Sequence, residues 1–128
     1  MSKNIVKDKS RKFALRIIKL YGYLKDVKKE RVLSLQVLRS GTSIGANIVE
    51  AHYAMSKKEF IAKMNISLKE AAETEYWLDL LHESKFIEKK DYQSINDDCV
   101  EILKLLLSII KTANDELNKL KNISKEKV

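Results

Sequence analysis

Apolar residues recur at intervals of three and four along most of the chain, with polar positions between them. This spacing gathers apolar side chains on one face of a helix, whereas a half-buried strand would alternate them. The pattern predicts four helices, over residues 5–25, 31–55, 57–84 and 89–120. Short connections favour antiparallel neighbours, so the predicted fold class is all-α, an antiparallel up-down-up-down four-helix bundle. Residues 1–120 are expected to form this single domain, followed by a polar, frayed tail, 121–128.

The fourth segment has the most regular pattern, a seam whose spacing alternates between three and four residues as in a coiled coil. This seam consists of Tyr92, Ile95, Cys99, Ile102, Leu106, Ile109 and Ala113. Further apolar residues lie outside the seam, at Leu103, Leu105, Leu107 and Ile110, and one bundle seam cannot bury all of them. Excess apolar surface usually marks a partner interface, and self-association is the simplest use for it.

The second segment carries Gly41 and Gly45 in the middle of a predicted helix. Each glycine costs about 1 kcal/mol relative to alanine, a cost that a bundle accepts where another helix comes very close. A phosphate-binding loop is the competing interpretation, but no Gly-Lys-Ser/Thr signature follows. The sequence therefore predicts a close helix crossing. The expected inward face is a stripe of Leu38, Gly41, Gly45, Ile48, His52 and Met55, with Leu33, Val37, Ile44 and Ala51 beside it.

The turn between the second and third helices is predicted at Ser56-Lys57-Lys58-Glu59, which has the pattern of a capping box. If the chain reverses there, residues whose numbers add to about 112 face each other. That relation pairs Arg39 with Glu73, and Asn47 with Asn65. A bidentate arginine–carboxylate pair would fix the helix register, so we interpret Arg39 and Glu73 as a structural bridge in preference to a ligand site.

Positive charge is concentrated at one end of the chain. Residues 1–31 hold eleven Lys or Arg and three Asp or Glu, whereas the rest holds fourteen basic and fifteen acidic residues. Such asymmetry suggests an anionic partner, RNA or DNA, although it also keeps a helix soluble. The expected contact residues are Lys7, Lys9, Arg11, Lys12, Arg16 and Lys19. Lys9, Lys12, Arg16 and Lys19 should form one stripe, which Lys7 and Arg11 extend.

Catalytic and metal-binding patterns are not evident in the sequence. Asp79 and His82 have the spacing of one ligand pair of a di-iron bundle, but a second pair is missing. No Ser/His/Asp or Cys/His arrangement is identifiable. We therefore expect neither an enzyme, a metal site nor a cofactor. A single cysteine and the lack of a long apolar segment predict a cytoplasmic protein without membrane contact.

Tyr76 and Trp77 are adjacent, and successive helical residues diverge by 100°, so both rings cannot face the same core. We expect one ring in the core and the other at an oligomer interface, where aromatic side chains are enriched. Stacking of a nucleobase on the exposed ring is the alternative.

Two long blocks resemble a known family. The first, Gln36 to Ala51, reads QVLRSGTSIGANIVEA, and the second, Phe60 to Leu81, includes LKEAAETEYWL. Both are similar to the four-helix-bundle family of 23S rRNA intervening-sequence proteins. The resemblance implies ring-shaped homopentamers, some of them encoded within large-subunit rRNA genes. A branch similar in fold is the accessory protein of diversity-generating retroelements, which works with a reverse transcriptase and binds nucleic acid. The motifs do not assign this chain to that branch.

Two functions therefore compete. The first is an oligomeric, non-catalytic protein that binds RNA or DNA through its basic N-terminal helix. The second is a protein-interaction scaffold, for example for a reverse transcriptase, without direct contact to nucleic acid.

Overall fold

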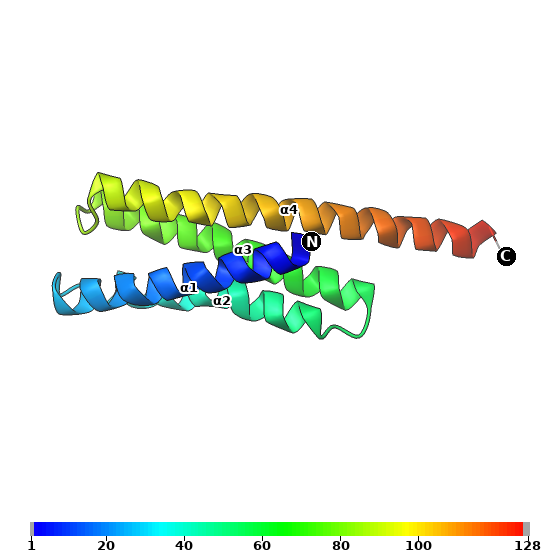
Figure 1. Ribbon diagram of the computed structural model, residues 1–128, viewed down its shortest axis with the longest axis horizontal. Coiled ribbons are helices and arrows are strands. Elements are labelled where there is room, and N and C mark those ends of the chain that lie inside the picture. Colours follow the sequence, from blue (N-terminus) through cyan, green and yellow to red (C-terminus); the bar gives the residue numbers. More distant parts are fainter. Residues whose placement is uncertain (1, 127–128) are drawn as a thin grey trace.

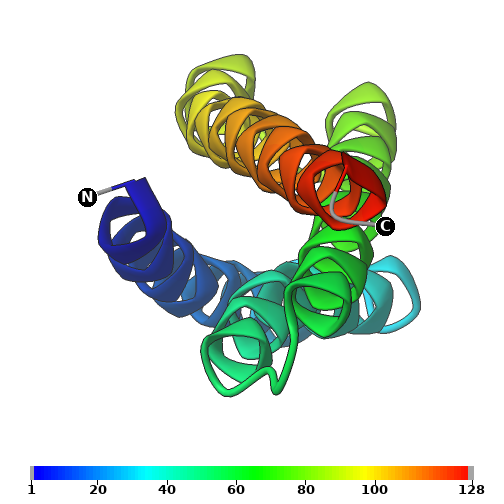
Figure 2. The ribbon, with the colours of Figure 1, turned by 90° about the vertical axis from the view of Figure 1, so that its right-hand side faces the viewer.

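The computed structural model describes residues 2–126, which form four helices (Figure 1). They are α1 (Ser2–Asp26), α2 (Leu33–His52), α3 (Lys57–Glu83) and α4 (Lys89–Glu126). Each helix packs on the next, and α1 also packs on α4, so the four helices surround one core (Figure 2). The described chain is thus the predicted up-down-up-down bundle.

Periodic apolar positions from all four helices build the core. The side chains of Phe13 and Ile17 on α1, Ile44 on α2, Leu78 on α3 and Leu106 on α4 are almost fully buried. Burying an aliphatic or aromatic side chain of this size contributes about 1.5–3 kcal/mol relative to exposure. The seam predicted on α4 is confirmed, because its members from Ile95 to Ala113 are buried and Tyr92 packs against the core.

The core buries more apolar residues of α4 than the seven-residue seam predicted from the sequence. Ile110 is only 8% exposed, and Leu103 and Leu105 pack partly against the core, which leaves Leu107 as the exposed member of that group. The helix also continues to Glu126, past the predicted end at 120, and its last turns project beyond the α2–α3 turn (Figure 1). Fraying of this end stays a prediction, and residues 127–128 of the expected tail lie outside the described residues.

The inward face of α2 is only partly as predicted. Gly41 and Ile48 are buried, as are the neighbouring Val37, Ile44 and Ala51, whereas His52 and Met55 are exposed. A strict seven-residue repeat drifts by about 20° per two turns on a straight helix, so the His52 position turns away from the core, and Met55 lies beyond the end of the helix. The helix also ends at His52 instead of continuing to 55, because the chain turns there.

The start of α3, just after the α2–α3 turn, is capped. The Oγ of Ser56 accepts a hydrogen bond from the Glu59 N–H at 3.1 Å, and the Glu59 carboxylate accepts the N–H of Met55 at 2.9 Å. This is the predicted capping box, except that the carboxylate reaches one residue further back.

A second cap, at the start of α2, was not predicted. The Glu30 carboxylate accepts the backbone N–H groups of Val32, Leu33 and Ser34. Burial alone would raise the pKa of Glu30, but these hydrogen bonds outweigh it and lower the pKa below its usual value. The connection after α1 is therefore a specific N-terminal cap, not only a charged linker.

The two mid-helix glycines of α2 face α1. A Cβ on Gly41 would lie 2.8 Å from Cγ1 of Ile17, and one on Gly45 would lie 3.3 Å from Oγ of Ser10. The predicted close crossing is therefore present, with its tightest point at Gly41. Gly22, by contrast, lies inside α1, not at its end, and a Cβ there would meet nothing within 4 Å.

We predict opposite effects for alanine at these two positions. Gly41→Ala forces the buried, branched Ile17 to move, an overpacking cost of about 1–3 kcal/mol that exceeds the gain of about 1 kcal/mol in helix propensity. Gly22→Ala gains helix propensity without a clash, so it should raise the melting temperature. Thermal unfolding followed by circular dichroism measures both variants. Equal stabilisation by the two substitutions would contradict the close crossing.

Candidate functional site

The six basic residues expected to bind nucleic acid lie on two flanks of α1, not on one stripe. Lys9, Lys12, Arg16 and Lys19 follow the flank toward α4, and Arg16 and Lys19 line a groove there. Lys7 and Arg11 line a different groove, between α1 and α2. The two residues expected to extend the stripe therefore belong to the opposite side of the helix.

Two of the six cations are paired with α4. Lys9 Nζ lies 3.2 Å from Oε1 of Glu101, and Arg16 Nη1 lies 2.6 Å from Oδ2 of Asp98. The Arg16 guanidinium also donates to the carbonyl and the Oγ of Ser94. These side chains are about half exposed, where such pairs contribute about 0–1 kcal/mol each. Lys9 and Arg16 therefore fasten α1 to α4 and are not freely available to an external anion.

The remaining four cations are available. The side chains of Lys7, Arg11, Lys12 and Lys19 are exposed, and within residues 2–126 none of them forms an ion pair. Lys12 and Lys19 are seven residues apart and share one face of α1. These four cations of α1 therefore have no ion-pair partner among the described residues and can contact an external anion.

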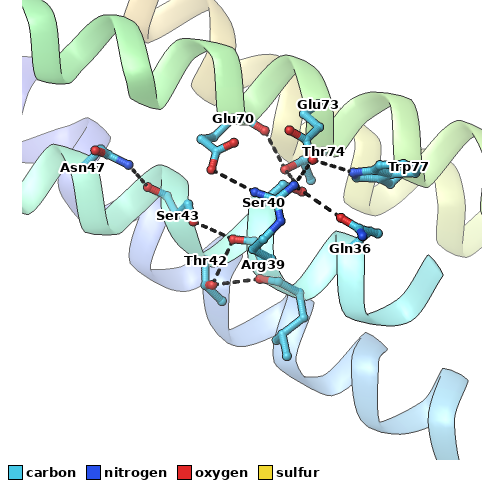
Figure 3. Close-up of polar contacts among 11 residues, drawn as sticks. Gln36, Arg39, Ser40, Thr42, Ser43, Asn47, Glu70, Glu73, Thr74 and Trp77 are labelled. Carbon is cyan, nitrogen blue, oxygen red and sulfur yellow. Dashed lines mark hydrogen bonds and ion pairs between the residues drawn. The ribbon is translucent and has the colours of Figure 1, made fainter. Parts of the chain in front are cut away.

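Arg39 joins α2 to α3 through a polar network (Figure 3). Its guanidinium contacts the Glu73 carboxylate, lies 3.5 Å from Oε2 of Glu70 and donates to Gln36 at 3.4 Å. Oε2 of Glu73 also accepts the indole N–H of Trp77 at 2.9 Å. The contact between Arg39 and Glu73 is the one that the turn position indicated, but the Arg39 side chain is 50% exposed, so the pair is not buried.

The second pair expected across this hairpin does not form. The side-chain amide of Asn47 donates to the Ser43 carbonyl at 2.8 Å, and that of Asn65 donates to the Ile61 carbonyl at 3.0 Å. Both asparagines therefore bind their own helix. An amide is short enough to reach the carbonyl four residues earlier, and this local partner replaces the partner across the interface.

The side chains of Trp77 and Tyr76 point to different sides of α3, as the 100° rotation between successive helical residues requires. Trp77 packs partly against the core, whereas Tyr76 is 56% exposed, and the two rings contact each other edge to face with centroids 5.1 Å apart. Tyr76 is therefore the aromatic residue that presents its side chain outward.

Buried hydroxyls between α2 and α3 were missed by the sequence analysis. Oγ1 of Thr74 lies 2.9 Å from Oγ of Ser40, and Oγ of Ser67 donates to the Ile44 carbonyl at 2.9 Å. All three side chains are fully buried. The sequence does contain a sign of these buried hydroxyls. Ser67 and Thr74 are polar residues at positions where the periodicity of α3 predicts a core-facing side chain.

Nothing in the described chain resembles a metal or redox centre. Within residues 2–126, no group of three or more His, Cys, Asp or Glu side chains lies close enough to hold a metal ion. The His82 ring instead stacks on Tyr92, with centroids 4.4 Å apart. Burial, aided by the charges of Glu75 and Asp98, raises the pKa of Cys99 to about 12, which keeps this thiol protonated. None of the four described helices could cross a membrane.

We predict that Glu73 stabilises the fold more than its partner Arg39 does. Arg39→Ala removes a half-exposed ion pair and should cost about 0.5–1 kcal/mol. Glu73→Ala also leaves the Trp77 indole N–H without its acceptor, which raises the cost to about 1–3 kcal/mol. Urea unfolding followed by tryptophan fluorescence measures both. Asp79→Ala, an exposed carboxylate on the same helix, is the control, and an equal loss from it and Glu73→Ala would refute the network.

Comparisons with known proteins agree with this architecture. Residues 2–108 match the family model of the 23S rRNA-intervening sequence protein. A crystal structure from Bacteroides thetaiotaomicron VPI-5482, of a protein with unknown function from the S23 ribosomal protein family, has 59% sequence identity and a TM-score of 0.86. The match covers 87% of this chain and 99% of that one. No curated protein matches the sequence. The chain belongs to the family of 23S rRNA-intervening sequence proteins.

Proposed function

We propose that this protein is a non-catalytic, oligomeric binding protein that holds RNA or DNA through the basic surface of α1. The observation that carries the proposal is the set of four exposed, unpaired cations, Lys7, Arg11, Lys12 and Lys19. Phosphate contacts supply nearly all of the affinity in non-specific nucleic-acid binding. Residues 1–31 carry eleven basic and three acidic residues and the rest fourteen basic and fifteen acidic, so the excess positive charge of the sequence lies in α1 and the turn that follows it.

Binding through this surface is independent of base sequence. Lysine and arginine on an exposed helix face contact phosphates, which fix position but carry no sequence information. We assign the function to the cytoplasm, because a lone cysteine that is buried and protonated fits a reducing compartment.

We further propose that the protein assembles as a homopentamer, as its family resemblance implies. Several large apolar side chains are exposed on the single chain, among them Tyr76, Leu107, Leu35 and Ile66. A symmetric assembly would bury some of this surface. It would also repeat the basic face of α1 in every subunit, and repeated weak contacts on one strand multiply the affinity.

We predict that removing the four unpaired charges abolishes binding while the fold persists. The variant carries Lys7→Gln, Arg11→Gln, Lys12→Gln and Lys19→Gln. The control carries the same loss of charge at exposed lysines elsewhere: Lys58→Gln, Lys69→Gln, Lys90→Gln and Lys121→Gln. Fluorescence anisotropy with labelled RNA and DNA at low salt measures the affinity.

The unmodified protein and the control should bind both nucleic acids. For duplex DNA, the logarithm of the affinity should fall by about 0.9 per phosphate contact for each tenfold rise in salt concentration. The α1 variant should show no binding. Equal affinity of all three proteins would refute the assignment to α1. Absence of binding by the unmodified protein would favour the protein-interaction scaffold.

We predict that light scattering gives the mass of five 14.8 kDa chains at micromolar concentration. Tyr76→Glu places a charge on the outward aromatic ring and should lower the mass, because a buried unpaired charge is costly. Tyr53→Glu changes a tyrosine that is 81% exposed beside the α2–α3 turn, and it should leave the mass unchanged. A monomer mass for the unmodified protein would contradict the assembly.

A further inference from the structure

A groove runs between α1 and α2, and its walls are mostly apolar. Ala14 on α1 and Gly45, Ala46 and Val49 on α2 line it, together with the stems of two basic side chains. Its volume of about 300 Å³ lies at the lower limit for small-ligand pockets. The small side chains of Ala14 and Ala46 leave room in the groove for one small, flat group.

The rim of the groove carries the two basic residues on the α2 side of α1, Lys7 and Arg11. Lys7 and Arg11 are four residues apart on α1, so they lie one above the other on the same face. Both are exposed and unpaired among the described residues. A guanidinium and an ammonium at this separation suit the oxygens of a phosphate group, which the arginine binds through two parallel hydrogen bonds.

One hydroxyl in the groove is positioned as an acceptor. Oγ1 of Thr42, which is half-buried, donates to the Leu38 carbonyl at 2.7 Å, whereas Ser10 is only 1% exposed and packs against Gly45. A hydroxyl has one proton, so the Thr42 oxygen is left to accept a hydrogen bond from a ligand. A ligand that fits must therefore combine an outer anion with an inner, flat body that carries N–H or O–H donors.

A nucleotide has this combination of groups, and we infer that the groove takes one unpaired nucleotide of a bound RNA or DNA strand. Its phosphate lies between Lys7 and Arg11, and its base lies against Ala46 and Val49 with a donor toward Thr42. The inference rests on the proposed function and adds a preference for single strands. In a duplex the base is paired and stacked, so a duplex reaches only the charged rim.

The test separates the groove from the charges around it. Ala46→Leu fills the groove from an exposed helical position without altering charge, and Val49→Phe fills it independently should the first variant fold poorly. Ala72→Leu makes the same change at an exposed position on α3 and is the matched control. Anisotropy titrations use one short oligonucleotide as single-stranded RNA, as single-stranded DNA and as the DNA duplex, and circular dichroism verifies the fold.

Filling the groove should weaken single-strand binding by about tenfold, which corresponds to about 1.4 kcal/mol of binding free energy, and leave duplex binding unchanged. The Ala72→Leu protein should bind both as the unmodified protein does. Unchanged single-strand affinity in the filled variants, or an equal loss for single strand and duplex, would overturn the inference and leave the proposed function in place. If the unmodified protein binds neither form, the proposed function fails as well.

Discussion

The close contact between Gly41 of α2 and Ile17 of α1 determines where α1 lies. Because the position opposite Ile17 has no Cβ, the two backbones approach closely and Ile17 is fully buried. The rotation of α1 about its axis is fixed by this contact and by the burial of Phe13 and Leu24. Its two flanks then meet different neighbours, with Lys7 and Arg11 beside α2 and Lys9 and Arg16 beside α4. Packing thus decides which charges are paired.

The fold and one contact of the candidate site could be predicted from the sequence, because they depend on local periodicity. The α4 seam follows a regular spacing of three and four residues, which predicts a core-facing helix. A capped turn at Ser56 fixes which residues of α2 and α3 face each other, and this relation predicted the contact between Arg39 and Glu73. The partners of Lys9 and Arg16 could not be found in the same way. They lie on α4, and the register between the first and last helices depends on every connection between them.

Other differences have similarly specific causes. The face of α2 was placed too close to His52, because a seven-residue repeat departs from the true helical period. The hydroxyls of Ser40, Ser67 and Thr74 were overlooked, because a search for apolar stripes passes over small polar residues that satisfy one another inside the core. Ile110 lies outside the predicted seam but is buried, because α4 packs against both α1 and α3. Contact with two helices covers a wider face of α4 than the single seam of a two-helix coiled coil would.

The charge pairing also links the proposed binding to the proposed assembly. With Lys9 paired to Glu101 and Arg16 to Asp98, one subunit offers four cations on α1 that form no ion pair among the described residues. So few phosphate contacts give weak binding, since non-specific dissociation constants are typically about 10⁻⁴–10⁻⁶ M even for larger sites. Joining copies of the same face raises the overall affinity by about 10²–10⁴ without any new kind of contact. A monomer with this surface would release nucleic acid readily at physiological salt, so the proposed binding by α1 would depend on the proposed assembly.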